Sequence, residues 1–163
     1  MGKSAGALEM SPPRYQGILD AEIPVVELPE NGGTLRVIAG TFAGTTGAAN
    51  TYTPINLWDL RLRAGHQVKL TLPEGHTAAL SILQGKLKVD GGMPAAEAEL
   101  VVFERSGTDL LAEAESETTF LVLSGEPIEE PLAGYGPFVM NTQQEIHQAL
   151  SDYQTGRMGH LTA

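Results

Sequence analysis

Alternating apolar and polar residues dominate the middle of the chain and predict β-strands. The clearest case is residues 55–63, where Trp58, Leu60 and Leu62 fall on one face and charged side chains fall on the other. Residues 77–84 are apolar on both faces, which is typical of a central strand. The same reasoning predicts strands at residues 35–39, 68–72, 86–90, 99–103, 109–112 and 118–124.

Glycine and proline separate these short strands at close intervals. Many short strands with Gly/Pro turns indicate an all-β fold, an antiparallel sandwich or barrel. Residues 40–50 are rich in Gly, Thr and Ala, so we expect a loop or irregular edge there. The apolar segment 135–140 also has the composition of a loop.

A single helix is predicted near the C-terminal end. Thr142 and Glu145 have the spacing of a capping box, and Gly156 fits the position just after a helix. The apolar stripe of this helix consists of Ile146, Ala149, Leu150 and Tyr153. The expected organisation is an arm or linker at 1–17, a barrel at 18–141, a helix at 142–156 packed on the barrel or swapped from it, and a tail at 157–163.

Composition narrows the possible functions. The 163 residues are 42% hydrophobic, enough for one packed domain, and 20 acidic residues oppose 10 basic ones. The net charge of −10 repels phosphate backbones, so no direct nucleic-acid partner is expected. No apolar run is long enough to cross a membrane, and the first residues lack the apolar segment of a secretory signal. The absence of cysteine excludes disulfides and thiolate chemistry, and we expect a cytoplasmic protein.

Several short motifs occur in a defined order along the chain. The strongest is the segment 125–142, GEPIEEPLAGYGPFVMNT, followed by a helix that ends in DYQTG. The other motifs are PRYQ at 13–16, TPINLWD at 53–59, PEGH at 73–76 and LQG at 83–85. Each motif is weak alone, but together and in this order they resemble the second domain of the pirin family, over nearly the whole chain from residue 13 to residue 159.

The resemblance implies a cupin-type jelly roll and a two-barrel parent architecture. In that family the N-terminal barrel binds iron through three histidines and a glutamate, and members are linked to quercetin dioxygenation and to transcription-factor partners. The similarity here starts at the linker, so none of those ligands can be carried over. The sequence is then either a free-standing homologue of the second domain or a fragment cut there.

The histidines do not fit a cupin metal centre. Such a centre needs a His-x-His pair, a nearby carboxylate and a histidine on a later strand. The chain has four histidines, none separated by a single residue: His66, His76, His147 and His160. We therefore expect no cofactor and no standard metal site. A non-standard pair, Glu74 and His76, is conceivable, although a solvated turn is the simpler explanation.

Nucleophilic and phosphate-binding chemistry is also disfavoured. Ser106 and Ser124 precede glycines but lack the strained strand–turn–helix context of a nucleophile elbow. The glycine-rich residues 40–47 are not followed by Lys-Ser or Lys-Thr, so they do not form a phosphate cradle. No catalytic residue is predicted.

Two kinds of binding surface remain. Asn56 and Trp58 share a strand face and could line a small cavity in the barrel, although Trp58 fits the core better. The closing segment could form an interface through Tyr135, Phe138, Met140, Ile146, Leu150 and Tyr153. The alternative is that this segment folds back over its own barrel.

The sequence favours a metal-free, pirin-like cupin domain that acts as a structural or protein-interaction module. Its partner would be a second copy in a homodimer or a separate cupin-domain chain. Two alternatives stay open: a metal-dependent or small-molecule-binding cupin of quercetin-dioxygenase type with a non-standard site, or the second half of a split bicupin.

Overall fold

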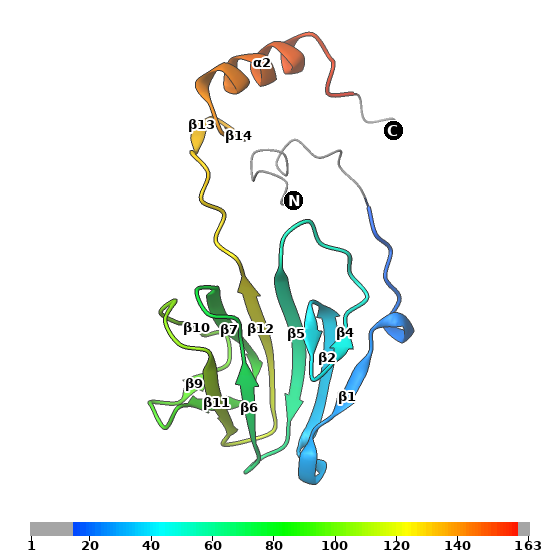
Figure 1. Ribbon diagram of the computed structural model, residues 1–163, viewed down its shortest axis with the longest axis vertical. Helices are drawn as coiled ribbons and strands as arrows, with labels where there is room; N and C mark the ends of the chain where they lie inside the picture. Colours follow the sequence, from blue (N-terminus) through cyan, green and yellow to red (C-terminus); the bar gives the residue numbers. More distant parts are fainter. Residues whose placement is uncertain (1–14, 160–163) are drawn as a thin grey trace. The chain divides into compact units, whose positions relative to one another are not determined.

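The computed structural model describes residues 15–159 and divides them into two compact units (Figure 1). The first unit runs from Tyr15 to Pro127 and contains the main sheets. The second unit is described from residue 128 to residue 159 and contains a hairpin and the helix. No helix in these described residues is long and apolar enough to cross a membrane.

The larger sheet of the first unit has six strands, and every paired neighbour is antiparallel. In spatial order the strands are β1 (Val25–Glu27), β2 (Gly33–Ala39), β5 (Ile55–Leu62), β12 (Thr118–Gly125), β7 (Thr77–Gln84) and β10 (Leu100–Val102). Because β7 is hydrogen-bonded on both sides, the prediction of an internal strand at 77–84 is confirmed.

The second sheet has four strands. Its spatial order is β6 (Gln67–Thr71), β11 (Asp109–Ala114), β8 (Lys86–Val89) and β9 (Ala95–Ala96). A small hairpin joins β3 (Thr41–Phe42) to β4 (Thr45–Thr46), and two short 3-10 turns, η1 (Asp20–Glu22) and η2 (Pro29–Asn31), flank β1. Two facing antiparallel sheets make the all-β, cupin-type jelly roll that the sequence predicted.

The core lies between the two sheets because the apolar faces of their strands turn inward. Trp58, Leu60 and Leu62 of β5 are each at most 1% exposed, as the alternation predicted. Trp58 pairs with Val37 on one side and Val122 on the other, and Val122 pairs with Leu80. Strand register therefore builds continuous apolar rows across the inner face.

The second unit is a hairpin with a helix on it. β13 (Ala133–Tyr135) and β14 (Phe138–Met140) pair through a two-residue turn, and helix α2 (Gln143–Gln154) contacts both strands. The capping box is confirmed, since Thr142 Oγ1 accepts a bond from the Glu145 amide and the Glu145 carboxylate accepts one from the Thr142 amide. Gly156 follows the helix with φ of 73°.

Two segments predicted as loops contain strands. Within residues 40–50 the chain forms the β3–β4 hairpin, and within 135–140 it forms one arm of the β13–β14 hairpin. Gly136, with φ of 57°, supplies the turn that reverses the chain. Strands this short are held by their partner and by packing, and a periodicity of two or three residues is too brief to identify them.

Candidate functional site

Two polar side chains, Asn56 and Ser124, interrupt the apolar inner face at one end of the six-stranded sheet. Ser124 pairs with Asn56 on β5 and with Ala78 on β7, directly next to the row that contains Trp58, Val122 and Leu80. Ser124 shares the strand parity of Phe120 and Val122 and is only 5% exposed. A buried hydroxyl needs a hydrogen-bond partner, so its surroundings are informative.

The partner of Ser124 is His76. Its Nδ1 lies 2.9 Å from Ser124 Oγ, across 48 residues of sequence. His76 is placed by the turn after β6, where its amide donates to the Pro73 carbonyl. The turn thus holds the imidazole at the end of the sandwich, against the last inward residue of β12.

Two hollows meet at His76, and both lie within the first unit. The larger, of about 660 Å³, is lined by uncharged residues, among them Thr41, Asn56 and Leu72. The smaller, of about 210 Å³, includes the carboxylates of Asp90, Glu104 and Asp109. His76, Leu72 and Pro73 therefore line both a neutral pocket and an acidic one.

The electrostatics of the acidic pocket are set by one ion pair. Hydrogen bonds from Lys69 and from Thr71, helped by the charge of Lys69, hold the pKa of Asp109 below its usual value of 3.8, against a smaller opposing effect of desolvation. Lys69 Nζ lies 2.8 Å from Asp109 Oδ2, and Thr71 Oγ1 donates to Asp109 Oδ1 at 2.7 Å. The Asp109 carboxylate is therefore ionised at neutral pH and bonded to Lys69 and Thr71.

The pair proposed as a non-standard metal site does not share a partner. His76 bonds Ser124, whereas Glu74 Oε1 accepts a bond from the Gly107 amide at 3.4 Å. Across residues 15–159 no group of three or more His, Cys, Asp or Glu side chains is placed to hold an ion. The inward rows that would have to carry ligands are built from Leu, Val, Phe and Trp. These residues do not fit a cupin metal centre.

Asn56 and Trp58 have different surroundings although they share a strand face. Asn56 lines the neutral pocket, and its Oδ1 accepts a bond from the Thr41 amide at 3.3 Å. Trp58 is 1% exposed in the core, with Phe42 packed edge-on at 5.1 Å between ring centroids. Its Nε1 has no hydrogen-bond partner among the described residues.

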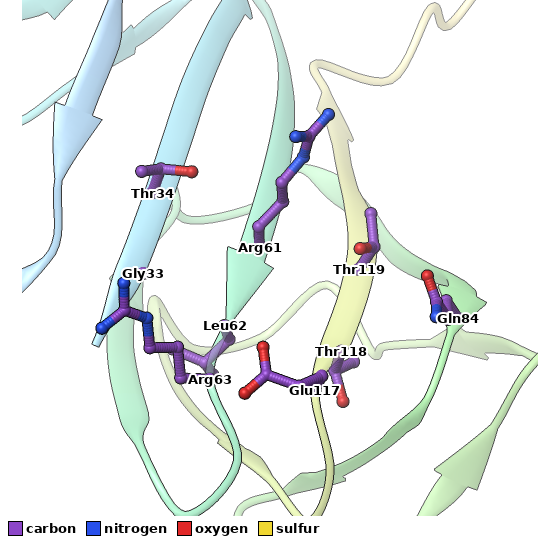
Figure 2. A pocket seen from close by; sticks show the side chains of 9 residues that line it. All are labelled: Gly33, Thr34, Arg61, Leu62, Arg63, Gln84, Glu117, Thr118 and Thr119. Carbon is purple, nitrogen blue, oxygen red and sulfur yellow. The ribbon is translucent and has the colours of Figure 1, made fainter. Parts of the chain in front are cut away.

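A further hollow of about 300 Å³ lies at the far end of β5 (Figure 2). Thr34, Arg61, Thr119 and Gln84 form a row across four neighbouring strands. Figure 2 shows that the guanidinium groups of Arg61 and Arg63 point in different directions, and that the Glu117 carboxylate lies in the same hollow. The two cations do not converge, so this hollow is a weaker ligand site than the one at His76.

The residues predicted to form an interface lie in the second unit. Ile146 is buried, Phe138 packs edge-on against Tyr153, and Met140 and Leu150 are half-buried, so part of the stripe packs within the unit. Tyr135 and Tyr153 are 64% and 67% exposed. Leu132 and Val139 are also exposed on this unit, and the register turns Val139, which pairs with Gly134, to the opposite face of the hairpin from Tyr135. We call these four exposed residues together the hairpin surface.

The outer face of the six-stranded sheet is a second apolar surface. Val102 of the edge strand β10 pairs with Ala79, which pairs with Leu123, so their side chains lie in one row. Leu100 and Val102 are 60% and 66% exposed, and Leu123 is 39% exposed. We call this the outer-sheet surface.

The sequence analysis placed Ser124 at the end of a predicted strand but gave it no role in a site. The available signal was strand parity, because a residue two positions after Val122 must face inward if β12 continues. Its contact with His76 depends on the register of β7 and β12, which no local motif encodes.

The two facing sheets and their inner pocket define a cupin-type domain. Residues 57–159 match the family model described as the pirin C-terminal cupin domain, and the chain therefore belongs to the pirin family through this domain.

Relatives agree with this assignment. A Pseudomonas aeruginosa protein named "Putative quercetin 2,3-dioxygenase PA2418" is 48% identical over 91% of this chain and 52% of its own length. Pirin-1 of Arabidopsis thaliana is 38% identical over 93% of this chain and 54% of its own length. A crystal structure of quercetin 2,3-dioxygenase from Acinetobacter baumannii superposes with a TM-score of 0.89 and 41% identity, covering 96% of this chain and 55% of that one. The chain thus spans about half the length of the curated relatives it matches.

Proposed function

We propose that this chain is a structural and protein-interaction module: a pirin-type cupin barrel without a metal centre of its own, which associates with a second copy. The observation that carries the proposal is the inner face of the barrel. Phe120, Leu60 and Ile82 fill the inner row next to that of Trp58, and each is at most 1% exposed. The side chains of these two rows offer no ligand atom for an ion, and their burial stabilises the fold instead.

Metal content tests the first half of this proposal. The chain is purified without chelator and its iron, nickel and zinc are measured by mass spectrometry against protein concentration. We expect far less than one ion per chain. A stoichiometric ion would overturn the metal-free assignment, and the variants Glu74→Gln and His76→Ala would then show whether that pair holds it.

The hairpin surface supports the second half. Leu132, Tyr135, Val139 and Tyr153 are each more than 60% exposed on one small unit. Exposed apolar clusters mark interaction sites, and a two-fold interface between identical copies lets one surface cover itself. Self-association that covers both faces of the hairpin would remove the four side chains from water.

Sedimentation equilibrium with matched variants tests the interface. The double variant Tyr135→Ser with Val139→Ser alters the hairpin surface, and the control Leu100→Ser with Val102→Ser alters the outer-sheet surface to a similar extent. We expect dimers in the parent protein and the control, and monomers in the hairpin variant. Monomers at every concentration of the parent protein, or loss of dimers in the control alone, would contradict the proposal.

A second candidate is the second half of a two-barrel assembly. The lengths of the matched regions favour this candidate. The match covers nearly all of this chain but only about half of the length of each relative. The chain would be mixed with the separately produced first half of the Pseudomonas relative, and co-elution and quercetin consumption would be followed. A stable one-to-one complex that consumes quercetin supports this candidate, and self-association alone would remove it.

A further inference from the structure

The neutral pocket at His76 contains side-chain hydrogen-bond donors that have no acceptor within the described protein. The Ser124 hydroxyl is buried and has the His76 ring as its one partner among the described residues. A buried hydroxyl donates its proton where an acceptor is in reach, and Nδ1 is that acceptor. No carboxylate of the described chain forms an ion pair with the His76 ring, although the acidic pocket that His76 also lines includes Asp90, Glu104 and Asp109. With Ser124 donating to Nδ1, the His76 ring carries a proton on Nε2.

Asn56 is oriented by the same kind of constraint. The Thr41 amide must meet an acceptor, so the amide oxygen of Asn56, and not its nitrogen, faces that backbone group. Gly40 makes this approach possible, because a Cβ at that position would lie 2.1 Å from Asn56 Oδ1. The NH₂ group of Asn56 is left as an unused donor, since no described residue accepts from it.

Two hydroxyl groups of the pocket have no free donor left for a ligand. The Thr51 hydroxyl donates to the Thr53 carbonyl, and the Thr71 hydroxyl donates to Asp109. The remaining lining is apolar or backbone, with Pro54, Ile55 and Leu72 among it, and no charged side chain takes part. Two residues with unused side-chain donors, Asn56 and His76, thus line a neutral, largely apolar hollow of about 660 Å³.

We propose that this pocket binds a small, neutral organic molecule through a carbonyl oxygen, which accepts hydrogen bonds from His76 Nε2 and Asn56 Nδ2. The apolar body of the ligand lies against Leu72, Ile55 and Pro54. A carboxylate is disfavoured, because the pocket offers no cation and the chain carries a net charge of −10. Ser124 is a positioning residue, acting through the tautomer of His76.

Three probes of similar size test the proposal by ligand-observed NMR: acetophenone, ethylbenzene and benzoate. Acetophenone supplies the carbonyl, ethylbenzene has the same skeleton without it, and benzoate adds a charge. One or two neutral hydrogen bonds correspond to a preference for acetophenone over ethylbenzene of roughly two- to tenfold. Benzoate is expected to bind more weakly than acetophenone.

Variants locate the binding. His76→Phe keeps a ring but removes the donor, and we expect it to abolish the preference for acetophenone. His66→Phe is the matched control, because His66 lies outside both hollows that meet at His76, and we expect the preference to persist. Emission of the single tryptophan, Trp58, reports whether each variant is folded.

The ring nitrogens of His76 provide a readout that does not require the variants to fold. In the ¹⁵N spectrum of the parent protein we expect the His76 proton on Nε2. In the Ser124→Ala variant we expect both tautomers of His76 to be populated and acetophenone to bind more weakly. The proposal would be overturned by a proton on Nδ1 of His76 or by the absence of acetophenone binding. It would equally be overturned if ethylbenzene bound as tightly as acetophenone or if benzoate bound more tightly. A preference for acetophenone that survives His76→Phe would also overturn it.

Discussion

At the scale of single residues, Gly40 and Gly44 offer a matched pair of substitutions. Both have positive φ, 78° and 81°, but a Cβ at Gly44 meets nothing within 4 Å, whereas one at Gly40 meets Asn56 Oδ1 and the Ile55 carbonyl oxygen at 2.1 and 2.4 Å. Gly44→Ala should therefore cost only the left-handed backbone strain, about 1 kcal/mol. Gly40→Ala adds a steric overlap and should cost about 2 kcal/mol more.

Urea unfolding followed by Trp58 fluorescence measures both free energies. The difference between the variants isolates the close approach of the β3–β4 hairpin to Asn56. Equal losses in the two variants would mean that this contact does not constrain the folded state.

Asp109 provides a pH-dependent prediction at the same scale. Its pKa is lowered in the folded protein by the hydrogen bonds from Lys69 and Thr71, so the folded state binds this proton less readily than the unfolded state does. The stabilisation is present above the usual value of 3.8 and is lost as the pH falls through the lower folded value. Acid should therefore reduce the stability advantage of the parent protein over Asp109→Asn.

Carboxyl ¹³C titration measures this pKa directly. We expect a value below 3.8 in the parent protein, with upward shifts in Lys69→Gln and in Thr71→Val. The larger shift is expected for Lys69→Gln, since that change removes both a hydrogen bond and a charge. An Asp109 pKa at or above 3.8 in the parent protein would refute the assigned cause.

At the scale of elements, helix α2 depends on its N-terminal cap. Thr142→Ala removes the acceptor for the Glu145 amide and should cost about 1 kcal/mol of helix stability. Hydrogen exchange of the Ala149 and Leu150 amides should then accelerate about fivefold, because helix opening precedes exchange. Ser151→Ala, on the exposed side of the same helix, is the control. Unchanged amide exchange in Thr142→Ala would show that packing of the helix on the hairpin outweighs the contribution of the cap.

The elements differ in how far the sequence predicts them. The eight residues of β5 carry enough alternation to fix both its existence and its inward face, and the capping box marks the start of α2 within one residue. The hairpin β13–β14 has three residues in each strand, too few for a period to be read. Its turn signal, Gly136 followed by Pro137, was the evidence available.

The candidate site shows the same limit for a different reason. Asn56 could be placed on the inner face because it shares the parity of Trp58. The His76–Ser124 contact could not be predicted, since it joins a turn to a strand 48 residues away and depends on tertiary register. Local patterns determine which way a side chain faces, and only the assembled sheet determines what it meets.

At the scale of the whole molecule, the net charge of −10 makes the proposed self-association dependent on salt. Two copies repel one another at low ionic strength, where the Debye length is about 30 Å at 0.01 M, whereas at 0.15 M it falls to about 8 Å and most of the repulsion is screened. The hairpin surface is apolar, so its own attraction is not weakened by salt. The dissociation constant measured by sedimentation should therefore decrease several-fold between these two conditions. Weaker association at higher salt would instead reveal ion pairs across the interface, and the apolar hairpin surface would then be the wrong contact.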